Sequence, residues 1–136
     1  MESEGVNKRR YRRIYFSEDL LISGVIAESD THTEFLVKIL NLSEGGLFFT
    51  VAREKARYFQ EKGTVLFLGL RGPGPFNLAE KLNMEIKWVC DNEIMENIGY
   101  GCEFIDPPSR SVDQIRCMVN DFLADSMKYG DGKIRA

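Results

Sequence analysis

Several features that define common protein classes are missing from this chain of 136 residues. No apolar run approaches the roughly 20 residues that a membrane-spanning helix needs. No apolar segment follows the basic cluster near the N-terminus, as a secretory signal would require. We therefore expect a cytoplasmic protein without a membrane span, long enough to enclose one hydrophobic core.

Patterns typical of metal sites and catalysis are missing as well. The three cysteines, Cys90, Cys102 and Cys117, form no CxxC pair, and His32 is the single histidine. A zinc site needs soft ligands at close spacing, so we expect no metal and reduced thiols. No nucleophile motif or acid–base pair stands out. The sequence thus predicts a protein that is not an enzyme, has no catalytic residues and needs no cofactor.

Positive charge is scarce outside one short segment. The net charge of −3 includes +5 from the segment Lys8–Arg13, which leaves −8 on the rest of the chain. A uniformly acidic body repels long polyanions, whereas a basic cluster on an acidic body favours a small, defined anion site. We therefore expect no broad nucleic-acid surface, which needs a basic face.

Alternating apolar and polar residues predict a mainly β fold. Strands are expected over residues 16–27, 34–40, 47–50, 64–70, 82–88 and 98–104. In the fifth strand, Leu82, Met84, Ile86 and Trp88 fall on one face, so core packing is the favoured role of Trp88, with a stacking wall beside a ligand as the alternative. Closure of six antiparallel strands into a β-barrel would remove exposed strand edges.

Two helices complete the predicted fold. A short helix is expected over 52–62, after the third strand. An amphipathic C-terminal helix is expected over 109–127, with Ser111 and Gln114 at capping-box spacing. The predicted organisation is a disordered N-terminus at 1–7, an arginine arm at 8–13, a barrel at 14–105, the helix at 109–127 and a flexible tail at 128–136, the domain proper being 8–127.

The basic cluster is the first candidate for binding. It reads Lys8-Arg9-Arg10-Tyr11-Arg12-Arg13 and runs directly into a predicted strand. Such clusters are commonly solvated tails. Arginine, however, offers a planar fork that holds phosphate or the O6/N7 edge of guanine with two hydrogen bonds, and its face stacks on bases. An arm of several arginines therefore suits a ligand that carries both phosphate and base.

The second candidate is the predicted turn Asn41-Leu42-Ser43-Glu44-Gly45-Gly46. Asn and Ser side chains in turns bond to nearby backbone, and glycine supplies unusual backbone angles. The turn would also present Asn41, Ser43 and the bare backbone of Gly46 to a flat polar ligand, with no Cβ in the way.

Taken together, these segments resemble the PilZ domain family. The resemblance rests on Arg9-x-x-x-Arg13, followed by Asn41-x-Ser43-x-x-Gly46, and on the strand Gly101–Phe104 before a helix. It spans roughly residues 8–124. Each motif alone is common, whereas the pair in this order and strand context is fairly specific.

The resemblance implies a bacterial receptor for the second messenger cyclic di-GMP, built on a six-stranded barrel. It implies that Arg9 and Arg13 hold guanine edges and phosphates, supported by Arg10, and that Asn41, Ser43 and Gly46 bind a guanine. Lys8 and Arg12 would add positive field beside the ligand. Asn41 stands where many members have Asp, so we expect a somewhat lower affinity, because a neutral amide loses charge-assisted acceptance.

Three functions remain open from the sequence. In the first, ligand binding orders the arginine arm over the barrel and a partner protein, or a second copy, reads the new surface. In the second, the chain is a protein interaction module that acts without ligand. In the third, which the acidic body disfavours, it is a small nucleic-acid-binding barrel. The sequence leaves open whether one or two dinucleotides bind, and whether the protein is a monomer or a homodimer.

Overall fold

The computed structural model describes residues 12–17, 20–74, 76–91, 94 and 96–128. These residues form β1 (Arg13–Tyr15), β2 (Ser23–Glu28), β3 (Glu34–Ser43), β4 (Gly46–Ala52), η1 (Arg53–Tyr58), β5 (Thr64–Arg71), β6 (Leu82–Cys90), β7 (Asn97–Phe104) and α2 (Ser109–Lys128). The predicted short helix is therefore a 3-10 helix, η1. No helix in the described ranges is both long and apolar enough to cross a membrane.

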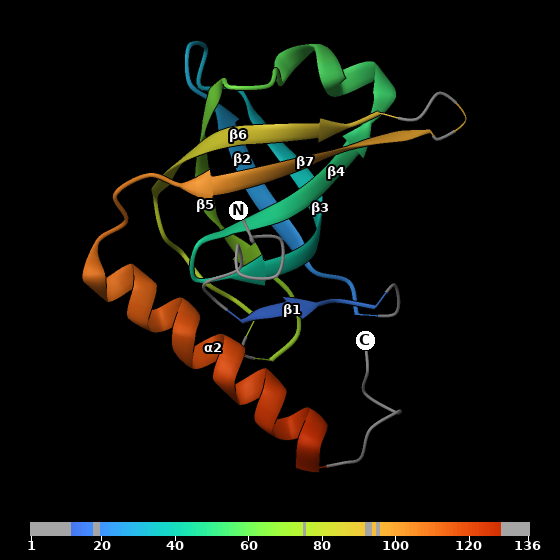
Figure 1. Cartoon of the computed structure of the whole chain (residues 1–136). Helices are drawn as coiled ribbons and strands as arrows, with labels where there is room; N and C mark the ends of the chain where they lie inside the picture. The colour runs from blue at the N-terminus through green and yellow to red at the C-terminus, as the bar shows by residue number, and fades with distance from the viewer. Residues whose placement is uncertain (1–11, 18–19, 75, 92–93, 95, 129–136) are drawn as a thin grey trace, which may run out of the picture.

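The strands form a closed barrel. Neighbouring strands run antiparallel in the order β3-β2-β5-β6-β7-β4, and β4 pairs again with β3 to close the ring. The short strand β1 lies outside this ring and pairs with the end of β3, where Arg13 is opposite Ser43 and Tyr15 is opposite Asn41. The predicted fold, a six-stranded antiparallel barrel with a C-terminal helix, is confirmed (Figure 1).

The barrel interior is filled by the inward side chains that alternation predicts. The largest fully buried side chains in the described residues are Tyr100, Phe49, Phe67, Ile14, Ile22, Ile26, Ile39, Leu42, Leu47, Leu82, Met84 and Ile86. Helix α2 lies across one end of the barrel, beside β1 (Figure 1). There, the ring of Phe122 meets the rings of Phe16 and Phe76 at centroid distances of 6.0 and 5.8 Å. Burial of this aromatic group seals that end of the core.

The predicted first strand over 16–27 is wrong in its first half. Extended pairing stops after Tyr15 and resumes only at Ser23. Between them the chain turns, with the amide of Leu20 donating to the carbonyl of Ser17 at 3.1 Å. Phe16 and Ile22 are buried at the sealed end of the barrel. Because the segment contains buried apolar residues, its composition is like that of a strand, although it is the connection between β1 and β2.

The predicted capping box is also wrong. Helix α2 begins at Ser109, so Ser111 lies inside the first turn. The amides of Ser111 and Val112 donate to the carbonyl of Pro108 at 3.0 and 3.1 Å. The buried hydroxyl of Ser111 donates instead to Glu80 Oε1 at 2.5 Å. The side chain that the local pattern assigned to capping therefore makes a tertiary hydrogen bond instead.

Candidate functional site

A cleft of about 450 Å³ lies on the outside of the barrel, where the β3–β4 hairpin meets β6, β7 and the start of α2. Its lining consists of Arg13, Ser43, Glu44, Gly45, Gly46, Leu47, Lys87, Trp88, Gly101, Cys102, Glu103, Phe104, Pro107 and Val112. Residues from both predicted motifs therefore share one concave surface. Concave sites that combine apolar walls with a few polar groups are typical of small-ligand binding.

The segment predicted as a six-residue turn is mostly strand. Ser43 pairs with Gly46, so only Glu44 and Gly45 form the turn of a tight hairpin. The amide of Gly45 donates to Ser43 Oγ at 3.1 Å and stabilises that turn. Asn41 and Ser43 are two residues apart on β3, where side chains point to the same face, and both are buried. Ser43 lines the cleft, whereas Asn41 is not among its lining residues.

Arg13 joins the two motifs. Because β1 pairs with the end of β3, Arg13 stands opposite Ser43 and its Nη1 donates to Asn41 Oδ1 at 2.8 Å. Arg13 is also one of the residues that line the cleft. Three of the predicted site residues, Arg13, Asn41 and Ser43, are thus brought together although 28 residues separate Arg13 from Asn41. Of the other predicted cationic residues, Arg12 is exposed, and Lys8, Arg9 and Arg10 lie outside the described residues.

Gly46 is required by the packing of the barrel itself. It starts β4 opposite Glu103 of β7. A Cβ added at this position would overlap the carbonyl oxygen of Cys102, a backbone atom that cannot swing aside. Glycine is therefore needed here whether or not a ligand binds, which is a structural reason for the last position of the second motif.

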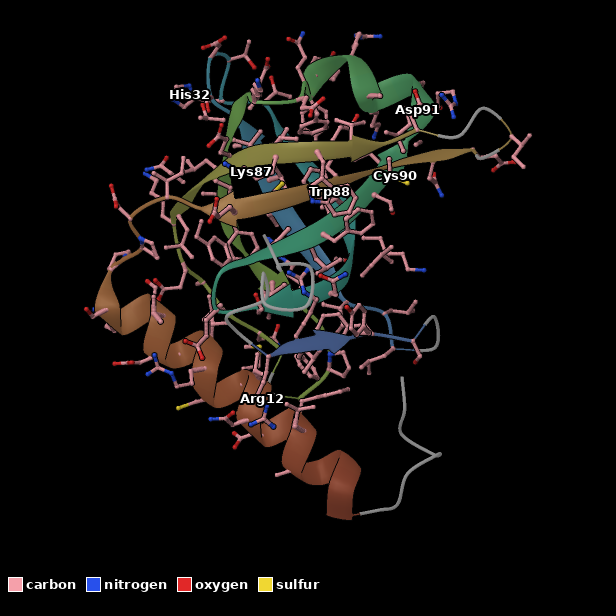
Figure 2. All side chains as sticks on the ribbon, in the orientation of Figure 1. Arg12, His32, Lys87, Trp88, Cys90 and Asp91 are labelled. Carbon is pink, nitrogen blue, oxygen red and sulfur yellow. The ribbon has the colours of Figure 1, made fainter. Side chains whose placement is uncertain are left out.

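The favoured prediction for Trp88, packing in the core, is wrong. Trp88 is 49% exposed and lines the cleft (Figure 2), a position that leaves the alternative, a stacking wall beside a ligand, as a prediction. The cause is a register shift in the pairing of β6 with β7: Ile86 stands opposite Cys102, but Trp88 stands opposite Gly101. The extra residue, Lys87, breaks the alternation as a β-bulge does. The indole therefore turns outward instead of following Met84 and Ile86.

Glycines on β7 make room for the outward rings. Trp88 stacks on Phe48 with ring centroids 5.1 Å apart and planes inclined by 25°. A Cβ at Gly101 would overlap the indole, and a Cβ at Gly99 would overlap the ring of Phe48. The pattern Gly99-Tyr100-Gly101 was the sequence signal for these rings, because alternate glycines in a strand mark a face over which another group lies closely.

Apart from Arg13, sequence reasoning missed the charged residues of the cleft, which are Lys87, Glu44 and Glu103. The Lys87 ammonium lies 3.4 Å from Glu85 Oε1 and 3.5 Å from Glu103 Oε1. The charge of Glu85, then the hydrogen bonds to Glu85 and Glu103, raise the pKa of Lys87. This ammonium therefore stays positive at the rim of the cleft at physiological pH.

Glu44, in the middle of the second motif, is held by helix α2. Arg116 donates from Nη2 to Glu44 Oε1 at 3.1 Å and from Nε to Oε2 at 3.2 Å, a fork-to-fork contact. The hydrogen bonds to Glu44 raise the pKa of Arg116. The side chain of Glu44 is only 16% exposed. The hairpin at the cleft is thereby tied to a helix that starts far along the chain.

Cys102 is the cleft-lining thiol. Its burial raises its pKa to about 12, so the thiol stays protonated near neutral pH and is a poor nucleophile. Cys90 and Cys117 are exposed, and all three cysteines are free thiols. Within the described part of the chain, no group of three or more His, Cys, Asp or Glu residues is placed to hold a metal ion.

Comparison with known proteins identifies relatives of this architecture. The model of the PilZ domain family matches residues 7–121. Among solved structures, MrkH of K. pneumonia in complex with c-di-GMP has a TM-score of 0.72 and 12% identity, covering 90% of this chain and 55% of that one. The PilZ domain of YcgR from Escherichia coli with c-di-GMP has a TM-score of 0.67 and 12% identity, covering 93% and 99%.

A third structure, PlzA of Borreliella burgdorferi in complex with c-di-GMP, has a TM-score of 0.58 and 13% identity, covering 91% of this chain and 55% of that one. This chain thus spans about half the length of MrkH and PlzA, but almost all of the YcgR PilZ domain. A search of curated proteins found no match. At these identities the solved structures establish the shared fold.

Proposed function

The chain belongs to the PilZ domain family, and on this premise we propose that it is a receptor that binds cyclic di-GMP in the cleft between the β3–β4 hairpin and β6–β7. The observation that carries the proposal is the hydrogen bond from Arg13 to Asn41, which unites the two motifs at the cleft. The solved structures of MrkH, YcgR and PlzA that share this fold are complexes with c-di-GMP, which supports the proposal.

The proposed binding residues contact different parts of the ligand. Cyclic di-GMP carries two guanines and two phosphates. The forks of Arg9, Arg10 and Arg13 suit both groups, since a guanidinium matches phosphate oxygens and the O6/N7 edge of guanine equally well. Asn41, Ser43 and Gly46 would meet a guanine from the barrel surface.

Trp88 and Lys87 extend the proposed site beyond the motifs. The exposed part of the indole offers a stacking surface for a base, and the Lys87 ammonium adds positive charge at the rim. Two carboxylates of the cleft, Glu44 and Glu103, are already engaged by Arg116 and Lys87. Engaged carboxylates repel a bound phosphate less than free ones would.

The proposed signal is the closing of the arginine arm. Binding draws Arg9 and Arg10 toward the cleft beside Arg13, and the covered cleft becomes a new surface for a partner protein. The free energy of ligand binding drives this change, because the ligand contacts the arm only in the closed arrangement.

Calorimetric titration with cyclic di-GMP tests the proposal. We expect a dissociation constant below about 10 µM, equivalent to roughly 7 kcal/mol of binding free energy. Cyclic di-AMP is the matched control, since it keeps both phosphates and changes only the base edges, and it is expected to bind much more weakly. Absence of binding at tens of micromolar cyclic di-GMP would refute the receptor function. The stoichiometry reports whether one or two dinucleotides bind.

Trp88→Ala is expected to weaken cyclic di-GMP binding by about tenfold or more, because stacking of a base on an aromatic ring contributes roughly 1–3 kcal/mol. Trp88→Phe retains a stacking face and should recover most of the loss. Trp88 is the single tryptophan of the chain, so selectively excited tryptophan fluorescence reports on this site alone and should change on titration of the wild type. An unchanged affinity in Trp88→Ala argues against stacking at this wall.

A further inference from the structure

The outer face of β3, β2 and β5 carries an aliphatic stripe that shares no residue with the cleft. Leu36 of β3 is 66% exposed and stands opposite Val25 of β2. Val25 in turn stands opposite Gly69 of β5, beside Leu68. Val25 and Leu68 are half-buried and line a second hollow of about 440 Å³ on this face. A contiguous apolar patch on a sheet face is a more specific feature than single exposed side chains.

Opposite charges lie at the two ends of this stripe. Lys38 follows Leu36 by two residues on β3. It stands opposite Ser23 of β2, which in turn stands opposite Arg71 of β5, so this end of the stripe is basic. Two residues the other way, Glu34 makes the opposite end acidic. Within the described residues, neither Glu34 nor Lys38 has an ion-pair partner. Because side chains two apart in a strand share a face, Glu34, Leu36 and Lys38 present an acidic, apolar and basic series outward.

This series is complementary to itself. We propose that the outer face of β3, β2 and β5 is a docking surface for a second copy of this chain, related by a two-fold axis that crosses the strands at Leu36. Such an axis reverses the strand direction. It places Lys38 of one copy over Glu34 of the other, twice, with the two Leu36 side chains packed between them. An interface of this kind uses the same patch on both copies, and packed sheets favour nearly aligned strands.

The charges select this axis over its alternative. A two-fold axis running along β2 would place β3 of one copy over β5 of the other. Lys38 would then face Arg71, two like charges that repel. Only the axis across the strands converts both unpaired charges into ion pairs. This self-complementarity is why a second copy, and not an unrelated protein, is the assigned occupant.

The dimer is expected to be weak. Three strands spaced about 4.8 Å apart give a face narrower than that of a standard interface, which buries roughly 800 Å² on each partner. Sedimentation velocity over a concentration series from about 10 to 500 µM suits such a transient contact. The wild type is expected to shift from monomer toward dimer across this range, and a wild type that stays monomeric throughout would overturn the proposal.

A charge-swap experiment tests the assigned geometry. Lys38→Glu and Glu34→Lys are each expected to remain monomeric, since each brings like charges together at both contacts. An equimolar mixture of the two variants is expected to dimerise, because every contact then joins Glu to Lys. The double variant Glu34→Lys/Lys38→Glu should also dimerise like the wild type. Circular dichroism confirms that each variant is folded before mixing.

Matched controls separate this surface from general stickiness. Leu36→Asp should abolish the dimer, whereas Leu21→Asp should not, although Leu21 is even more exposed, at 71%. Dimerisation of either single charge variant, or a mixture that dimerises no better than its components, would refute the proposed axis. The experiment needs no cyclic di-GMP, so its outcome is independent of the proposed receptor function.

Discussion

Arg13→Ala is expected to weaken cyclic di-GMP binding by about 100-fold, or roughly 2.7 kcal/mol. That is the size of loss produced by removing one or two charge-assisted hydrogen bonds from a binding site. Arg13 already donates to Asn41 and lines the cleft, so its removal takes away both the ligand contact and the link between the two motifs. Calorimetric titration of the variant measures the effect.

Two further variants define the cause of that loss. Arg12→Ala removes the same charge from the neighbouring, exposed residue and is expected to change affinity by no more than a few-fold, since a single exposed charge contributes little. Arg13→Lys keeps the charge but loses the planar fork, so it should recover only part of the affinity. Equal effects of Arg12→Ala and Arg13→Ala would mean that the segment acts only as a diffuse basic field. Wild-type binding by Arg13→Ala would refute the assignment of this residue.

Gly46→Ala is expected to destabilise the fold by about 3 kcal/mol, toward the upper end of what overpacking costs. The added Cβ overlaps the carbonyl oxygen of Cys102, and that carbonyl is fixed in the β4–β7 ladder. The two strands must therefore separate where the hairpin begins. Urea unfolding followed by circular dichroism should show a lower midpoint with an unchanged slope.

Gly74→Ala provides the matched control for that experiment. A Cβ at Gly74 meets nothing within 4 Å, although its φ of +60° is left-handed, so the expected loss is only about 1 kcal/mol of backbone strain. A Gly46→Ala variant as stable as Gly74→Ala would contradict the close approach of β4 to β7. Where Gly46→Ala still folds, its affinity for cyclic di-GMP separately tests whether the site tolerates the shifted hairpin.

The barrel could be predicted because alternation along a strand follows directly from which side chains are buried. Leu82, Met84 and Ile86 were expected inside and are fully buried. The same rule failed one step further along, at Trp88. A register shift is a property of the pair of strands, β6 and β7, and nothing in β6 alone indicates that Lys87 is the extra residue.

The candidate site was predicted in part, for a similar reason. The residue types of the two motifs were visible in the sequence, but their meeting was not. Arg13 reaches Asn41 only because β1 adds to the outside of β3. Glu44 and Arg116, which lie 72 residues apart, gave no local signal at all. Contacts of this kind depend on topology, which no window of the sequence contains.

The sequence by itself determined a mainly β barrel with a terminal helix, and a chemistry of arginine forks beside an Asn-Ser-Gly motif. Both follow from properties of single residues and short spacings, namely burial preference and functional groups. Only the tertiary structure decided that Trp88 faces the cleft, that Gly46 is required by the carbonyl of Cys102, and that Arg116 holds the hairpin. Each of these results from strands or helices that are distant in the chain and come together only when the barrel closes.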